Sequence, residues 1–223
     1  MVDPIALSRP RSSVKLILEL RFRINRRLRN HIWRRLRIIA GKYRGRNLKS
    51  PPSLETRPTS DRLRESLFNV IAPRIRGVRF LDLCAGSGAV GIEALSRDAA
   101  HATFVDRSRD MRGLIKSNLE LCRVLEEKVA VVMSDALEFL HKAVKRKVQA
   151  WDIVFFDPPY ADDYVSVMEA LGGFASELLV SDALLIVEHF HKNELPAEVG
   201  NLTRQRVLKQ GDSALSFYQR RPD

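Results

Sequence analysis

Short apolar runs alternate with amphipathic stretches from residue 78 onward. The apolar runs predict strands at 78–83, 102–105, 129–133, 152–156 and 183–188. The stretches between them predict helices at 89–96, 109–121 and 136–144, and another from residue 163 or 164 to 171. This alternation predicts an α/β fold whose parallel sheet is covered by helices on both faces. Two last runs, 204–209 and 214–219, flank Gly211 and predict an antiparallel hairpin at the edge of the sheet.

The chain before residue 78 has a different pattern. Residues 37–49 alternate small, apolar and basic groups around Gly41 and Gly45, which predicts a short β-hairpin with a basic tip. A proline-rich linker follows, and a helix then begins at Ser60 or Asp61. We therefore divide the chain into a basic extension (1–36), a basic hairpin with its linker (37–55) and a main domain (56–223).

Composition narrows the class of protein. A chain of 223 residues is long enough for one α/β domain with a short appendage. Its hydrophobic content of 45% excludes a chain that is disordered throughout. No apolar run approaches the roughly 20 residues of a membrane-spanning helix. Two cysteines are too few for a disulfide scaffold or a cysteine-based zinc site, and they favour a reducing compartment, which we take to be the cytoplasm.

The net charge of +11 is distributed unevenly. Residues 1–64 contain 18 Lys and Arg against 4 Asp and Glu, whereas residues 65–223 contain 20 against 23. A basic segment on a nearly neutral domain indicates a polyanionic partner, with nucleic acid ahead of an anionic membrane surface. Residues 1–36 themselves fit an organellar transit peptide, an RNA-binding arm or an unstructured extension, and we favour the last two.

A glycine-rich turn carries the first chemical signal. Gly86, Gly88 and Gly91 have the G-x-G-x-x-G spacing between a predicted strand and a predicted helix, which suits close approach of the backbone to a nucleotide cofactor. A plain tight turn would have the same spacing. Asp82, at the end of the preceding strand, changes the balance because its carboxylate would repel a pyrophosphate. It suits a cofactor with a positively charged amino-acid end, such as S-adenosylmethionine.

Two more acids end predicted strands. Asp106 can accept hydrogen bonds from both hydroxyls of a ribose, and Asp135 can accept one from an adenine amino group. Each has an ordinary alternative role, because each also precedes a predicted helix that it could cap.

The most specific element is Asp157-Pro158-Pro159-Tyr160, directly after an apolar strand. Two successive prolines fix the backbone and remove two N–H donors, so that nearby carbonyl groups can face a ligand. Asp157 and the Pro158 carbonyl can accept the N–H bonds of an exocyclic amine, and Tyr160 can stack on the base. This arrangement suits methylation of a base amine. A proline turn that only ends a strand is the alternative.

Together with two N-terminal segments, these motifs resemble a known family. The segments are RIIAGKYRGR (37–46) and TRPTSDR (56–62), and the match continues through 82–94, 157–160 and GDSALSFY (211–218). In them the chain resembles the bacterial small-subunit rRNA guanine-N2 methyltransferases of the RsmD type, which act on guanine-966 of 16S rRNA. Asp106 replaces an expected Glu, and Cys84 replaces a more usual Phe. Residues 1–36 have no counterpart and leave an organellar location open.

The resemblance implies a Rossmann-like fold with a seven-stranded, mostly parallel sheet and an antiparallel last strand. It implies S-adenosylmethionine as donor, methyl transfer at Asp157, Pro158 and Tyr160, and a partly assembled ribosomal subunit as substrate. We expect Asp82, Gly86, Gly88, Asp106 and Asp135 to bind the cofactor. We expect RNA phosphates to be held by Lys42, Tyr43, Arg44, Arg46, Arg57, Arg62 and Arg64. A sulfonium already carries a good leaving group and needs no Lewis acid, so we expect no metal. We also expect a monomer.

Other functions remain open. The Asp157 motif also serves N6-adenine methyltransferases acting on DNA or RNA, although no separate target-recognition domain is visible. A rRNA-binding assembly factor without catalysis would keep the basic segment but would not bind S-adenosylmethionine. An NAD-dependent oxidoreductase would share the glycine turn but would need neither the double-proline motif nor a basic arm.

Overall fold

The computed structural model describes residues 36–51, 61–159 and 164–221. The described residues all belong to one compact unit, Leu36–Asp223. The strands are β1 (Arg79–Leu83), β2 (His101–Asp106), β3 (Val129–Met133), β4 (Trp151–Phe156), β5 (Leu179–Phe190), β6 (Glu198–Val199), β7 (Leu202–Gln210) and β8 (Ser213–Arg220). The helices are α2 (Asp61–Ile71), α3 (Ala89–Ser96), α4 (Arg109–Cys122), α5 (Ala136–Lys145) and α6 (Tyr164–Gly172). Short 3₁₀ turns occupy Glu126–Lys128 and Ser176–Leu178.

One mixed sheet organises the described residues. Its strand order is β3-β2-β1-β4-β5-β8-β7-β6, and the strands from β3 to β5 are parallel. β8, β7 and β6 each run antiparallel to the strand before them in that order. The expectation of seven strands was therefore wrong, because the two-residue strand β6 extends the edge beyond the predicted hairpin. A strand of two residues, Glu198 and Val199, is too short to show the alternation of apolar and polar residues that predicts a strand.

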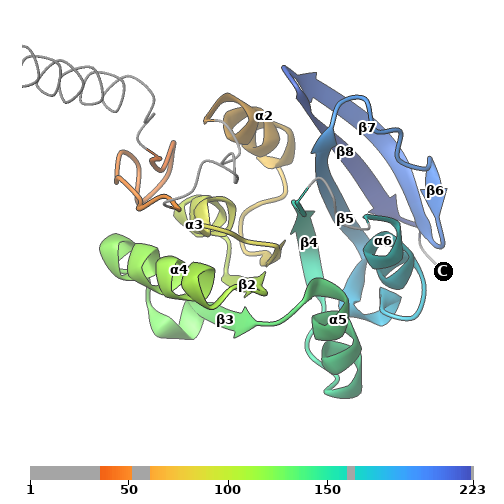
Figure 1. Cartoon of the computed structure of the whole chain (residues 1–223), viewed down its shortest axis with the longest axis horizontal. Coiled ribbons are helices and arrows are strands. Elements are labelled where there is room, and N and C mark those ends of the chain that lie inside the picture. Colours follow the sequence, from red (N-terminus) through yellow and green to blue (C-terminus); the bar gives the residue numbers. More distant parts are fainter. Residues whose placement is uncertain (1–35, 52–60, 160–163, 222–223) are drawn as a thin grey trace, which may run out of the picture. The chain divides into compact units, whose positions relative to one another are not determined.

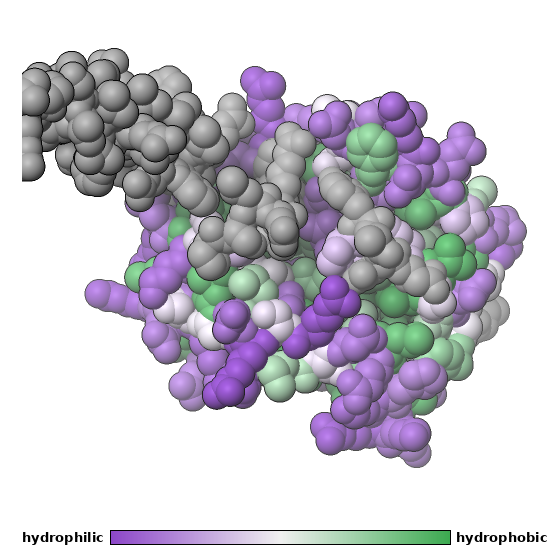
Figure 2. Space-filling model, in the orientation of Figure 1, coloured by the Kyte–Doolittle hydropathy of each residue, from purple (hydrophilic) through white to green (hydrophobic). Residues whose placement is uncertain are grey.

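Helices cover both faces of the sheet, as the apolar runs predicted. Figure 1 shows α2, α3 and α4 on one side and α5 and α6 on the other. Two hydrophobic clusters match this division: Phe80, Phe104 and Phe155 belong to the first cluster, and Leu81 and Phe156 belong to the second. Successive strand residues point to opposite faces, so a strand that is buried on both sides must be apolar throughout. The outer side of α5 carries hydrophilic side chains (Figure 2).

Residues 37–49, which we call the N-terminal arm, form a loop that folds back on itself. Arg37 and Asn47 make a single antiparallel bridge, and residues 41–45 turn between them. The predicted β-hairpin is therefore present in a short form: its two limbs are joined by this bridge and by main-chain hydrogen bonds from Ile38 N to Arg46 O at 3.0 Å and from Leu48 N to Leu36 O at 2.7 Å. Ile38 and Leu48 are buried in the first hydrophobic cluster, so the arm packs as part of the compact unit.

Two buried side chains of α3 hold the arm. Glu93 accepts hydrogen bonds from Ile39 N at 2.7 Å and from Ala40 N at 2.9 Å. Ser96 accepts one from Tyr43 N at 2.9 Å through its hydroxyl and one from Lys42 N at 2.7 Å through its carbonyl. The arm thereby caps the C-terminal end of α3, where helix carbonyl groups would otherwise lack partners.

Removing the Glu93 carboxylate should destabilise the protein strongly. The group is fully buried, and it also pairs with Arg97 Nε at 2.8 Å. We expect Glu93→Ala to lower the free energy of unfolding by about 3–5 kcal/mol, because two main-chain N–H groups and a guanidinium lose their acceptor. Urea denaturation measures the difference.

Glu138→Ala is the matched control. Glu138 pairs with Lys142 over the same i, i+4 spacing, but both side chains are more than half exposed. This substitution should change the free energy of unfolding by no more than about 0.5 kcal/mol. If both variants lost the same free energy of unfolding, burial of the Glu93 pair would not explain its contribution to stability.

Candidate active site

The carboxyl ends of three strands lie level at one edge of the sheet. Leu83, the last residue of β1, pairs with Val105 of β2 and with Phe156 of β4. Asp106 and Asp157 directly follow these two partners, and Asp157 N donates to Leu83 O at 3.3 Å. The edge therefore brings Asp82, Asp106 and Asp157 together. Open α/β sheets bind their ligands at this edge.

The turn after β1 has the backbone of a cofactor cradle. Cys84, Gly86 and Gly88 all have positive φ, at 61°, 53° and 74°. A Cβ atom added at Gly86 would meet nothing within 4 Å, so the turn faces open space at that point. At Gly91 the requirement is different, because a Cβ there would collide with the ring of Phe104. The three glycines thus serve turn conformation, access and close packing of α3 on β2.

Asp82 has a strongly perturbed carboxyl group. Its side chain is buried beneath the first turn of α3, where Oδ2 accepts a hydrogen bond from Gly91 N at 2.9 Å. Burial raises the pKa of Asp82 to about 8, the Gly91 hydrogen bond lowers it in part, and the nearby Asp106 charge raises it further. A cationic ligand would favour the ionised form. The α-ammonium group of S-adenosylmethionine has the charge that would favour this ionised form.

Asp106 holds the glycine turn against β2. Its Oδ2 accepts from Gly86 N at 2.9 Å, and its Oδ1 accepts from Ser108 N at 2.8 Å. The cap of α4 is Ser108 itself, whose hydroxyl accepts from Met111 N. Each carboxylate oxygen of Asp106 can accept more than one hydrogen bond, so the observed contacts are compatible with its predicted role toward a ribose.

Asp135 performs the ordinary role that its sequence position allows. It is the N-cap of α5, and its Oδ1 accepts from Leu137 N at 2.9 Å and from Glu138 N at 3.4 Å. The structure therefore shows the capping contacts, and hydrogen bonding to adenine stays a prediction for this residue.

The double-proline motif begins at the same edge. Asp157 is half-buried, Pro158 is buried and Pro159 is exposed, whereas Tyr160 lies outside the described residues. A further acid, Glu188, is not among the predicted site residues. It is 4% exposed and follows Val187, the partner of Phe156, which brings it to the level of Asp157 on the neighbouring strand. An acid that ends a long apolar run was the available signal.

The basic residues expected to bind RNA occupy several locations. The main chain of Lys42 and Tyr43 lies at the C-terminal end of α3, and Lys42 Nζ pairs with Asp98 at 2.7 Å, which raises the pKa of the lysine. The glycine turn is at the other end of α3. Eight residues at 1.5 Å each put about 12 Å between these two ends. The tip of the arm is therefore remote from the glycine turn.

Other basic residues differ in how accessible they are. Arg46 donates from Nη1 to Leu121 O at 3.0 Å and lies over the Tyr43 ring. Arg44 and Arg62 are exposed, and Arg57 lies outside the described residues. Arg64 corrects an expectation. Its side chain is fully buried and donates from Nη2 to Arg37 O and to Asp61 Oδ1, so it is structural and cannot hold an RNA phosphate.

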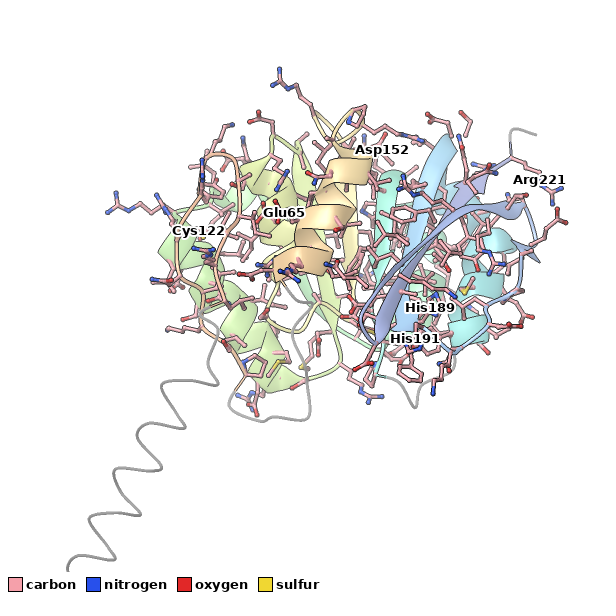
Figure 3. The ribbon with its side chains drawn as sticks, turned by 90° about the horizontal axis from the view of Figure 1, so that it is seen from above. Glu65, Cys122, Asp152, His189, His191 and Arg221 are labelled. Atoms are coloured by element: carbon pink, nitrogen blue, oxygen red, sulfur yellow. The ribbon has the colours of Figure 1, made fainter. Side chains whose placement is uncertain are left out.

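The histidines near the end of β5 have structural contacts. Figure 3 shows His189 and His191 at the edge of the sheet opposite to Asp152, which lies near the start of β4. His189 Nε2 contacts the Ser216 hydroxyl at 2.9 Å, and His191 Nδ1 contacts Asp212 O at 3.2 Å. The described part of the chain contains no group of three or more His, Cys, Asp or Glu side chains placed to hold a metal. In the same ranges, no helix has the length and apolar character needed to cross a bilayer.

Known proteins resemble most of this chain. A family model described as conserved hypothetical protein 95 matches residues 36–219. The Ribosomal RNA small subunit methyltransferase D of Escherichia coli is 39% identical over 189 residues, covering 83% of this chain and 90% of that protein. YlbH of Bacillus subtilis is 39% identical over 186 residues, covering 83% of this chain and all of YlbH.

Solved structures share the architecture. TTHA0928 of Thermus thermophilus superposes with a TM-score of 0.69 at 33% identity, covering 81% of this chain and 97% of that one. SMU.776, solved in complex with SAH, superposes with a TM-score of 0.56 at 16% identity, covering 70% of this chain and 49% of that one. The second likeness concerns the fold alone.

Proposed function

The chain belongs to the conserved hypothetical protein 95 family, and from this membership we propose that it methylates N2 of a guanine in small-subunit rRNA, specifically guanine-966 of 16S rRNA. The family membership and its relatives make the chain an S-adenosylmethionine-dependent rRNA methyltransferase. The choice of nucleotide is our proposal. That choice rests on the resemblance to Ribosomal RNA small subunit methyltransferase D. The observation that supports methyl transfer from S-adenosylmethionine is the meeting of buried Asp82, the open glycine turn and the Asp157-Pro158 motif at one edge of the sheet.

Each part of this edge has a task in the proposed reaction. S-adenosylmethionine supplies a methyl group on a positively charged sulfur. Asp82 holds the amino-acid end of the cofactor, the main chain of Gly86 and Gly88 admits it, and Asp106 and Asp135 orient the ribose and the adenine. All these roles use backbone and carboxylate acceptors, which suit a ligand rich in N–H and O–H donors.

Asp157 and Pro158 act on the substrate amine. The lone pair of an exocyclic guanine amine is delocalised into the ring, which makes the nitrogen a poor nucleophile. Hydrogen bonds from the amine to the Asp157 carboxylate and to the Pro158 carbonyl would favour a tetrahedral nitrogen whose lone pair points at the methyl group. Tyr160 would stack on the base and hold its plane.

Arg44 offers a specific test of the RNA-binding role of the arm. We expect Arg44→Ala to weaken binding to rRNA and to reduce the slope of log K against log salt by about 1, since one phosphate contact is lost. Affinity for SAH should stay unchanged. Filter binding at several salt concentrations measures the affinity for rRNA and its salt dependence.

Lys145→Ala is the matched control for Arg44. Lys145 is also exposed, but it ends α5, on the face of the sheet opposite to the arm. Its removal should leave the salt dependence unaltered. Equal slopes for Arg44→Ala and wild type would remove the arm tip from the RNA-binding surface.

Nucleoside mass spectrometry of rRNA tests the whole proposal. Cells lacking this protein should lose N2-methylguanosine at one small-subunit position, and the wild-type chain should restore it. Loss of N6-methyladenosine instead would favour the adenine alternative. An unchanged profile, with rRNA binding but no SAH binding by the purified protein, would favour an assembly factor.

The partner and the location belong to the same proposal. We propose that the substrate is a partly assembled small subunit in the cytoplasm and that the enzyme acts as a monomer. A basic extension of 36 residues that approaches the subunit would add counterion release to the binding energy. Sedimentation of the protein with precursor subunits from cells tests this proposal.

A further inference from the structure

One buried amide connects the N-terminal arm to the glycine turn. Asn118 of α4 is completely buried. Its Oδ1 accepts from Lys49 N at 2.8 Å, and its Nδ2 donates to Lys49 O at 3.1 Å and to Ser87 O at 2.9 Å. Ser87 lies between Gly86 and Gly88 in the glycine turn. The Asn118 side chain therefore bonds to the main-chain N and O of Lys49 in the arm and to the carbonyl of Ser87 in the turn.

The two connected segments have different tasks in the proposed function. Lys49 is at the end of the arm and leads into the linker that carries Arg57, whereas Ser87 belongs to the turn that would admit the cofactor. The tip of the arm contacts the C-terminal end of α3, away from the glycine turn. Lys49, in contrast, is separated from the glycine turn by one side chain, because Asn118 bonds to both Lys49 and Ser87. Within the described residues, Asn118 bridges the two segments directly.

We propose that Asn118 is a positioning residue that couples RNA binding at the arm to cofactor binding at the glycine turn. The inference rests on the proposed function. A ligand that orders one segment lowers the entropic cost of ordering the other, because both depend on the same amide, and the coupling is therefore positive and reciprocal. RNA tightens the binding of the cofactor, and the cofactor tightens the binding of RNA.

The test measures SAH affinity with and without RNA. Equilibrium dialysis with radiolabelled SAH is run alone and with unmethylated small subunits from cells lacking the protein. For the wild-type chain we expect the subunits to tighten SAH binding about fivefold or more. In Asn118→Asp, which keeps the acceptor for Lys49 N but loses both donated bonds, the ratio should fall below about twofold.

Lys49→Ala is the control variant. It removes the ammonium group that contacts the Ser117 hydroxyl at 2.6 Å but keeps the main-chain bonds to Asn118. Its RNA affinity should fall while the SAH ratio stays at the wild-type value. If Asn118 had a merely structural role, Asn118→Asp would lower the affinities for RNA and for SAH. The factor by which the subunits tighten SAH binding would then stay at the wild-type value.

A second measurement uses only the wild-type chain. SAH alone should slow hydrogen exchange at the Lys49 amide as well as at residues 86–91. Protection confined to residues 86–91, or a wild-type SAH ratio near one, would overturn the coupling. If the wild-type chain fails to methylate the subunits at all, the proposed function itself is wrong, which is a different result from active enzyme without coupling.

Discussion

Replacing Asp157 with alanine should lower the rate constant for methyl transfer by about 10²–10³-fold, while affinity for SAH stays within a few-fold of wild type. Asp157 N bonds to Leu83 O, so the backbone at the end of β4 is fixed by β1 whatever side chain follows. The substitution would remove the carboxylate that accepts a hydrogen bond from the substrate amine. Because this hydrogen bond strengthens as the amine nitrogen becomes tetrahedral, its loss affects the rate constant more than substrate binding. Single-turnover methylation of unmodified small subunits measures it.

Asp182→Ala is the control for this substitution. Asp182 lies near the start of β5 and pairs with Arg74 at the protein surface. The variant should methylate at the wild-type rate. If Asp157→Ala lost SAH affinity by the same factor as it lost rate, the carboxylate would belong to the cofactor site instead of the substrate site.

Asp82→Asn should have two opposite effects. Affinity for SAH should fall by about 10- to 100-fold, because a charge-assisted hydrogen bond to the cofactor ammonium contributes about 1.5–3 kcal/mol. The unliganded protein should become more stable at pH 8. Asparagine keeps an acceptor for Gly91 N but carries no charge that the interior must accommodate.

The pH dependence follows from the direction of the Asp82 shift. Its pKa is about 8 in the folded protein against an ordinary value of 3.8, so the unfolded chain ionises first as pH rises. The stabilising contribution is complete below about pH 4 and is lost progressively up to about pH 8, with an upper bound of about 6 kcal/mol. Thermal unfolding of the unliganded wild type and of Asp82→Asn, from pH 5 to pH 8.5, measures this loss.

Cofactor binding provides the internal check on Asp82. At one high concentration of SAH, the Tm of the wild type should rise more than that of Asp82→Asn, because the stabilisation by a ligand grows with the logarithm of its affinity for the folded state. A wild-type Tm that does not fall between pH 5 and pH 8.5 relative to Asp82→Asn would mean that the buried carboxyl group is already ionised without a ligand.

Much of the fold was determined by the sequence itself. The apolar pattern predicts the helix over Ala89–Ser96 and the strand over Val129–Met133 with their observed ends. Burial on both faces of a parallel sheet requires a continuous apolar run, and the inner strand β4 has one. The carboxyl-edge positions of Asp82, Asp106 and Asp157 followed from the same pattern, since parallel strands end at one edge. The family was also recognisable from its motifs alone.

Tertiary structure decided what each charged residue contacts. Arg64 and Arg62 are two residues apart in a basic segment, yet one is buried and the other exposed, because a helix turns by about 100° per residue. Glu93, Ser96 and Asn118 read as ordinary helix residues, and only packing shows that they hold the main chain of the arm. Local sequence determines backbone conformation and which faces are apolar, whereas hydrogen bonds between residues 49, 87 and 118 require the whole chain to be folded.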